Sequence, residues 1–191
     1  MQSFLHLQKQ QLDGLFELMD TVNSLYIKRS FSLDDQLVDL IKKAEDFFRQ
    51  NGRSNKAAEV GKLHIYLETA LKGIDPERLE KLKTGRRENI WISSFHCICG
   101  VQDVLGTNFE EIEVKLNKAK DTLGQVILSA LQSQLIDMDT LQGIQSLDQV
   151  KAFWMSLLQS EQIALIDKQL RLTIHEQDLI ILLDKIIEQL K

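Results

Sequence analysis

The chain has 191 residues, of which 43% are hydrophobic and 27% are charged, and its formal net charge is −5. These proportions are those of an ordinary soluble globular protein, long enough to bury a core without a disulfide or a metal. The acidic balance argues against a dedicated duplex-DNA binder, because neutralising phosphates requires an excess of lysine and arginine. One proline and nine glycines are few for a protein rich in β-turns, so the composition favours helices.

The chain lacks the sequence features of secreted and membrane proteins. Its two cysteines, Cys97 and Cys99, lie too close together to staple a fold, which is typical of a reducing compartment. The first residues show no basic region followed by an apolar run, and the longest C-terminal apolar stretch is far shorter than the ~20 residues of a membrane span. We therefore expect a cytoplasmic protein with no disulfide and no membrane segment.

Apolar residues recur every three or four positions along most of the chain, and no segment alternates with the period of a strand. The pattern predicts an all-α, multi-helix bundle of eight or nine helices and no sheet. The expected helices cover approximately 3–29, 33–50, 55–72, 76–85, 89–105, 108–135, 147–158, 161–172 and 174–190.

Most of the expected helix starts depend on capping signals. Single caps are expected at Ser32, Ser54 and Ser160, and a capping box at Ser146 with Gln149. Asp75-Pro76-Glu77 is typical of a helix that begins at a proline. Gly106 is expected to stop one helix, and Thr107 with Glu110 to open the next as a capping box. Thr173 with Glu176 is expected to open the last helix in the same way.

We expect residues 1–191 to form a single all-α domain. A mixed connector at 136–146 is the place where a soft boundary would separate a C-terminal three-helix part. The segment 66–77, YLETALKGIDPE, resembles the end of a tetratricopeptide repeat. The pattern has no companion about 34 residues away, so a helix end followed by a proline-led helix explains it better than a repeat array.

Residues 89–106, NIWISSFHCICGVQDVLG, form one of the most apolar parts of the chain. On a helix their apolar side chains cover well over half of the circumference, which is typical of a helix inside its domain. A narrow polar stripe remains, made of Asn89, Ser93, His96, Cys99 and Asp103. We favour core packing around a buried polar network, and a metal or redox site on His96, Cys99 and Asp103 is the alternative.

A second pair of weak metal candidates, His64 and Glu68, lies four residues apart on one predicted helix. Zinc requires four ligands, and one helix supplies at most half of them. The Glu-x-x-His motif of ferritin-like di-iron bundles is absent at every histidine. We therefore expect no metal and no cofactor, and an irregular site that combines His64, Glu68 and His96 stays an alternative.

No motif of a known reaction class stands out. The sequence has no glycine-rich phosphate loop, no GxSxG motif and no isolated pair of carboxylates. The cysteines lie in the middle of a predicted helix, where no helix N-terminus or cation lowers the pKa of a thiol. We therefore identify no catalytic residue and do not expect an enzyme.

The segment 72–87 is a local basic patch in an acidic chain, with six cations against three acids. Arg86 and Arg87 lie in a predicted turn, 84–87, where two guanidiniums could bind carboxylates or phosphates in a bidentate manner. A solvated surface is the ordinary interpretation of such a patch. If it serves recognition, we expect Lys83, Arg86 and Arg87 to contact a partner.

The last predicted helix is too apolar for one buried face. Three further apolar residues lie outside its core stripe: Ile180, Ile181 and Ile187. Burying an isoleucine contributes roughly 1.5–3 kcal/mol, so we expect these three side chains to meet a second chain. A homodimer through this helix is the default expectation, because two-fold dimers are the commonest closed assembly.

Together these patterns predict a non-catalytic helical protein-binding module, such as a regulator, an adaptor or a small subunit of an assembly. One alternative is an accessory nucleic-acid-binding subunit that uses the basic segment 72–87. A second alternative is a metal-dependent helical-bundle enzyme centred on His96.

Overall fold

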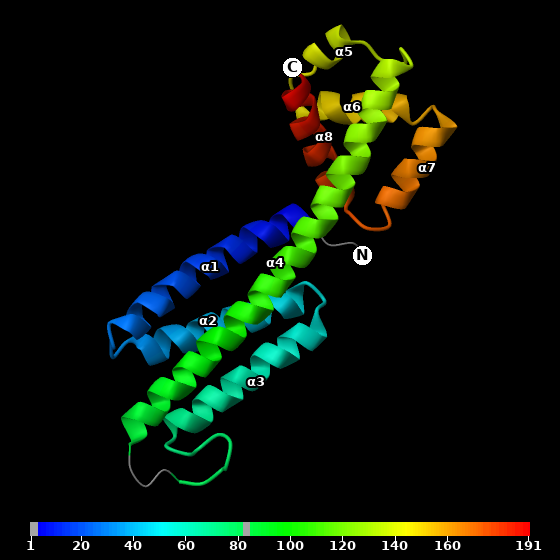
Figure 1. The fold of residues 1–191 in the computed structure, drawn as a ribbon. Coiled ribbons are helices and arrows are strands. Elements are labelled where there is room, and N and C mark those ends of the chain that lie inside the picture. Colours follow the sequence, from blue (N-terminus) through cyan, green and yellow to red (C-terminus); the bar gives the residue numbers. More distant parts are fainter. Residues whose placement is uncertain (1–3, 82–84) are drawn as a thin grey trace. The chain divides into compact units, whose positions relative to one another are not determined.

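The computed structural model describes residues 4–81 and 85–191, with the backbone alone at Arg86. Those residues form eight helices and no strand, so the predicted all-α fold is confirmed (Figure 1). The helices are α1 (Leu5–Ile27), α2 (Leu33–Gln50), α3 (Ser54–Leu71), α4 (Arg86–Gln132), α5 (Met138–Gln142), α6 (Leu147–Leu157), α7 (Glu161–Leu170) and α8 (Glu176–Leu190). None of the helices in these two stretches is both long enough and apolar enough to cross a bilayer.

The chain divides into two compact units. The first unit comprises Lys9–Phe109, and the second comprises Met1–Gln8 with Glu110–Lys191, so that α1 and α4 contribute residues to both. The predicted soft boundary at 136–146 falls inside the second unit, where the short helix α5 lies. The expectation of a single domain stays a prediction.

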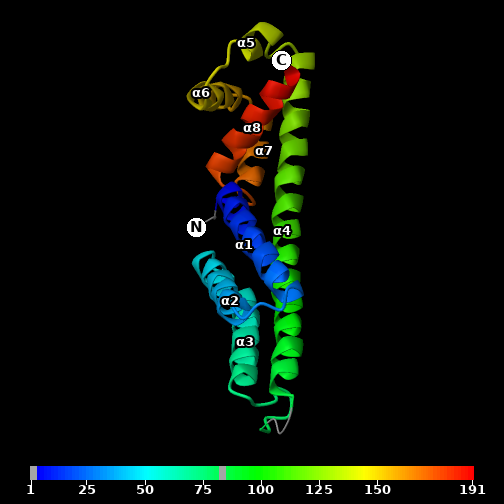
Figure 2. The ribbon, with the colours of Figure 1, turned by 90° about the vertical axis from the view of Figure 1, so that its left-hand side faces the viewer.

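The first unit is a bundle of α1, α2, α3 and the beginning of α4 (Figures 1 and 2). Its core is built from the apolar stripes that the sequence pattern identified, including Leu12 and Phe48, which are fully buried. α3 and α4 approach each other closely at Gly100, where a Cβ would lie only 2.8 Å from Cδ1 of Leu63. The thiol of Cys97 donates to the carbonyl of Leu63 at 3.5 Å, so this part of α4 is packed core, as predicted.

α4 runs without interruption over 47 residues, so the predicted helix end at Gly106 and the predicted capping box at Thr107 and Glu110 are wrong. Gly106 does not have the positive φ of a glycine that ends a helix. Leu105 and Ile112, on either side of this point, are fully buried. Burial of the stripe on both sides outweighs the roughly 1 kcal/mol that a glycine costs inside a helix.

The proline-led helix predicted at 76–85 is also wrong for its described residues, which form turns. The carboxylate of Asp75 accepts hydrogen bonds from the N–H groups of Glu77 and Arg78, at 2.9 and 3.2 Å. Leu79 then adopts a φ of 57°, which no residue inside a right-handed helix has. The capping aspartate therefore closes a local turn and no helix follows it.

A polar network holds the helices of the second unit together around a fully buried tryptophan. The indole N–H of Trp154 in α6 donates to Asp167 in α7 at 2.9 Å. The same carboxylate accepts a hydrogen bond from Nε of Arg171 at 2.7 Å. Arg171 and Lys151 both contact Glu176 at the start of α8, at 3.3 and 2.9 Å.

Asp178 caps two helices at once, which corrects the predicted start of α8 at Thr173. The capping box is His175 with Asp178, and α8 begins at Glu176. The buried carboxylate of Asp178 also accepts from the N–H groups of Leu5 and His6 and from the His6 ring, at 2.8, 2.9 and 2.7 Å. Burial alone would raise the pKa of Asp178, but these hydrogen bonds outweigh it and hold that pKa below its ordinary value.

Candidate functional site

The predicted polar stripe of α4 does not form one buried network. Ser93 is buried, whereas His96 and Asp103 are exposed and Cys99 is half-buried. The ring of His96 lies against Tyr66 of α3, with 4.7 Å between ring centroids. Within residues 4–81 and 85–191, no group of three or more His, Cys, Asp or Glu side chains is placed to hold a metal ion. The structure therefore does not bring His96, Cys99 and Asp103 together as a ligand set.

His64 and Glu68 lie four residues apart on α3, where His64 is half-buried and Glu68 is exposed. Nε2 of His64 lies 3.5 Å from the Glu68 carboxylate, which also contacts Nζ of Lys72 at 3.3 Å. The cysteine next to the stripe is chemically quiet, because burial raises the pKa of the Cys97 thiol to about 12. That thiol is therefore protonated at neutral pH, whereas a cysteine nucleophile must be a thiolate.

The structure describes only part of the predicted basic patch. Lys83 and the side chain of Arg86 lie outside the described residues. Arg87 is exposed in the first turn of α4, and its guanidinium carbon lies 5.0 Å from the centroid of the Phe31 ring. Arg87 is therefore joined to a set of aromatic residues that the sequence pattern did not connect with it.

The three surplus isoleucines of α8 do not share one environment. Ile187 is only 1% exposed and packs in the core of its own chain, so its side chain is not available to a second chain. Ile180 and Ile181 are half-buried. Most of the apolar side chains of α8 are buried in its own chain. A homodimer interface made of all three isoleucines is inconsistent with the burial of Ile187.

A cluster of aromatic, aliphatic and arginine side chains lies in the first unit, where α1 ends and α4 begins. We call it the aromatic–arginine surface, and it consists of Tyr26, Arg29, Phe31, Arg87, Trp91, Ile92 and Phe95. Three of its apolar side chains are more than half exposed: Phe31 at 88%, Ile92 at 60% and Phe95 at 54%. Scattered exposed apolar residues are ordinary, whereas a cluster of them is typical of an interaction site.

Stacked rings form the base of the aromatic–arginine surface. Tyr26 of α1 stacks on Trp91 of α4, with centroids 4.3 Å apart and an angle of 17° between the rings. Tyr26 also lies 5.7 Å from Phe95, one helical turn further along α4. The guanidinium of Arg29 covers Trp91, with its central carbon 5.7 Å from the ring centroid. Both arginines of the surface thus lie over aromatic rings, at cation–π distances.

The backbone at Arg29 has the geometry that usually calls for glycine. α1 ends in a Schellman motif, in which Arg29 N–H donates to Tyr26 C=O at 3.1 Å and Ser30 N–H donates to Leu25 C=O at 3.0 Å. Arg29 has a φ of 51° there, which costs a residue with a Cβ about 1–2 kcal/mol. At the equivalent places after α2 and α3 the chain carries Gly52 and Gly73.

The next residues hold Phe31 out into solvent. The hydroxyls of Ser30 and Ser32 lie 2.9 Å apart, and the Ser32 N–H donates to the Ser30 hydroxyl at 3.3 Å. Ser32 precedes α2 as predicted, but its side chain caps no helix N–H. The hydroxyl groups fix a tight turn, and the phenyl ring at its tip is in contact with Arg87.

Arg29, Arg87 and Trp91 line a hollowed part of the surface that consists of two adjoining hollows, one of which includes Glu88 and the other Asp34. Among the described residues, neither guanidinium makes an ion pair or a hydrogen bond with a side chain. Burial, followed by the neighbouring charge of Asp35, raises the pKa of Asp34. Asp34 forms no ion pair with either arginine.

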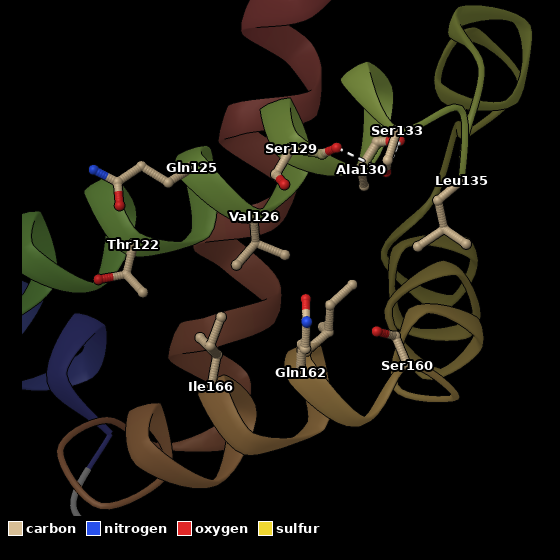
Figure 3. Close-up of a pocket in the computed structure, with 11 residues that line it drawn as sticks. Thr122, Gln125, Val126, Ser129, Ala130, Ser133, Leu135, Ser160, Gln162 and Ile166 are labelled. Carbon is tan, nitrogen blue, oxygen red and sulfur yellow. Dashed lines mark hydrogen bonds between the residues drawn. The ribbon is translucent and has the colours of Figure 1, made fainter.

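A second hollow lies between α4 and α7 in the second unit (Figure 3). Val126 and Ile166 point into it, and Thr122, Ser129 and Ser160 lie around it. No charged side chain is among the residues that line it. Its neutral lining offers hydrogen bonds without selecting a chemical class of ligand.

Comparison of the chain with family models, with curated proteins and with solved structures gives no match. The interpretation of the aromatic–arginine surface as a functional site therefore depends on its geometry alone. Sequence reasoning found Arg87 but assigned Tyr26, Trp91 and Phe95 to apolar core stripes. One available signal was Phe31, a large apolar residue inside the polar break Ser30-Phe31-Ser32.

Proposed function

We propose that this chain is a non-catalytic helical protein-binding module, acting as a regulator, an adaptor or a small subunit of an assembly. In this proposal the aromatic–arginine surface is its contact with a partner protein. The single observation that carries the proposal is the exposure of Phe31, Ile92 and Phe95 beside two guanidiniums that have no carboxylate partner among the described residues.

The composition of the surface supports a protein partner. Aromatic residues and arginine are enriched at the centres of protein interfaces, and they supply most of the binding energy there. Leaving a Phe and an Ile side chain in water forgoes roughly 1.5–3 kcal/mol for each, which an interface would recover. The turn 28–32 presents Phe31 outward by dedicated hydrogen bonds, so the exposure follows from the fold.

A comparison of capture by matched variants tests the proposal. The immobilised chain is incubated with an extract of its native host, and the bound proteins are identified for the wild type, for Phe31→Ala with Ile92→Ala, and for a control. The control is Leu165→Ala with Leu172→Ala, two exposed apolar residues in the second unit. Because all four side chains are exposed, we expect changes in stability within about 0.5 kcal/mol for each substitution.

The proposal predicts that proteins held by the wild type and by the control variant are lost from the Phe31→Ala, Ile92→Ala variant. Equal recovery from all three would remove the aromatic–arginine surface from consideration. Loss from the control variant alone would move the contact to the second unit.

A further inference from the structure

Arg29 and Arg87 have the features of a site that receives an anion. A guanidinium that lies flat on an aromatic ring still has its N–H groups directed outward in the plane of the group. The central guanidinium carbon of Arg29 lies over Trp91 at 5.7 Å from the ring centroid, and that of Arg87 lies over Phe31 at 5.0 Å. Both arginines line the same hollowed part of the surface, and neither has a carboxylate partner among the described residues. Guanidinium edges of this kind bind carboxylates with paired, charge-assisted hydrogen bonds.

The backbone at Arg29 is a second, independent observation. Of the Schellman motifs that end α1, α2, α3 and α4, two have glycine at the position of positive φ, Gly52 and Gly73, and two have a residue with a side chain, Arg29 and Gln134. Arg29 adopts the same backbone conformation although its Cβ makes a positive φ unfavourable. Strained backbone conformations are enriched at functional sites, and of these two residues it is Arg29 that lines a hollow together with a second arginine.

The surroundings of the hollow favour a negatively charged group that also has apolar neighbours. The hollow lies at the first two turns of α4, where the helix dipole is positive. The acids that line it, Asp34 and Glu88, form no ion pair with either arginine. The exposed rings and Ile92 stand next to the guanidiniums, so an anion placed there is flanked by apolar surface.

We propose, resting on the proposed function, that the partner segment is acidic as well as apolar. Its carboxylate binds the guanidiniums of Arg29 and Arg87, and a neighbouring large apolar side chain packs on Phe31 and Ile92. Arg29 and Arg87 set the specificity for the acid, whereas the apolar side chains supply the contact area.

Selection from a displayed library of random peptides on the immobilised full chain tests this chemistry. The selected peptides are expected to carry Asp or Glu next to Leu, Phe, Trp or Met. Their Kd values are expected to rise by at least about tenfold for Arg29→Gly and for Arg87→Gln. Arg78→Gln, an exposed arginine outside the surface, and Gln134→Gly, which relieves the same backbone conformation after α4, are expected to leave Kd unchanged.

Arg29→Gly keeps the test independent of folding, because glycine is the residue this chain places at the equivalent positions after α2 and α3. The melting temperature of this variant is expected to equal or exceed that of the wild type. Loss of peptide binding by a chain that melts at the same or a higher temperature separates recognition from stability.

Selection of neutral or basic peptides, or of none, would overturn the inference, as would acidic peptides that bind Arg29→Gly as tightly as the wild type. Binding of a single-stranded uridine oligonucleotide that depends on both arginines would also overturn it, in favour of a nucleic-acid partner. If the inference fails while Phe31→Ala with Ile92→Ala still abolishes capture of proteins, the proposed function survives it. If capture is unaffected as well, both fail.

Discussion

At the scale of single residues, the backbone of Arg29 lowers the stability of the fold, whereas its side chain is proposed to bind the partner. Its positive φ of 51° costs about 1–2 kcal/mol that a glycine would not incur. Arg29→Gly removes that cost, although glycine also gains freedom in the unfolded chain. We expect the free energy of unfolding to rise by up to about 1 kcal/mol, measured by urea denaturation.

Gln134→Gly is the matched control for this stability measurement. Gln134 has a φ of 55° in the Schellman motif that follows α4, so the same relief of backbone conformation applies. Similar changes for both variants are expected. A marked loss of stability in Arg29→Gly alone would show that the arginine holds the turn together.

Asp178 makes the stability of the second unit depend on pH. The pKa of its carboxyl is lowered in the folded state, so ionised Asp178 stabilises the fold above the unfolded pKa. This contribution is lost as the pH falls through the folded pKa. We expect Asp178→Asn to lower the free energy of unfolding by about 1–3 kcal/mol at neutral pH, because a buried acceptor of several hydrogen bonds is replaced.

The difference between wild type and Asp178→Asn should shrink as the pH falls below the unfolded pKa, and it should be smallest below the lowered folded pKa, where the carboxyl is protonated in both states. Denaturant titrations at neutral and acidic pH measure it. A difference that stays constant over the whole range would contradict the role given to the ionised carboxylate.

Ile187 and Ile181 differ in burial, and this gives a separate prediction for each. Ile187→Lys places a charge in the core and is expected to cost more than about 3 kcal/mol. Ile181→Lys changes a half-buried side chain and should leave the chain folded. Circular dichroism melts of the two single variants measure this, and equal melting temperatures would contradict the placement of α8.

At the scale of the elements, the continuity of α4 can be tested at one residue. Gly106 has open space around the position of a Cβ and lacks a positive φ. Gly106→Ala is therefore expected to raise the free energy of unfolding by about 0.5–1 kcal/mol, as in any helix interior. Gly52→Ala, at a φ of 69°, is expected to lower it. Destabilisation by Gly106→Ala would support the helix end that the sequence pattern predicted.

Periodicity predicted the spans of α1, α2 and α3 closely, because their apolar stripes are unbroken and end at polar or glycine-containing turns. It failed where a local capping signal competed with burial. At Gly106 the buried stripe continues on both sides and the helix continues with it. At Asp75 the capping side chain is satisfied by a turn, so no helix is needed.

The candidate site was less accessible to sequence reasoning than the helices. A charge count located Arg87, since cations clustered in an acidic chain stand out. Trp91 and Phe95 share the spacing of core residues, and periodicity does not tell which side of an apolar helix faces solvent. The role of Arg29 depends on its backbone conformation at the end of α1, which no residue pattern specifies.

At the scale of the whole molecule, the proposed function requires a chain of net charge −5 to bind an acidic partner through two arginines that have no carboxylate partner among the described residues. Overall repulsion and local attraction oppose each other for an acidic peptide, so added salt should change its Kd only modestly. A nucleic-acid ligand would instead lose affinity steeply as salt rises, because counterions are released on binding. A titration of Kd against ionic strength therefore distinguishes the two, and a steep loss would contradict a peptide partner.

The central claim is that a protein partner contacts the aromatic–arginine surface, and photo-crosslinking from position 31 tests it most directly. Phe31 is replaced by a photoreactive phenylalanine analogue in the native host, and Leu172 is replaced in the same way as an exposed control in the second unit. The account predicts a cross-link from position 31 to one protein, within a segment that is both acidic and apolar, and none to that protein from position 172. No adduct from position 31, the same adducts from both positions, or an adduct to nucleic acid would contradict it.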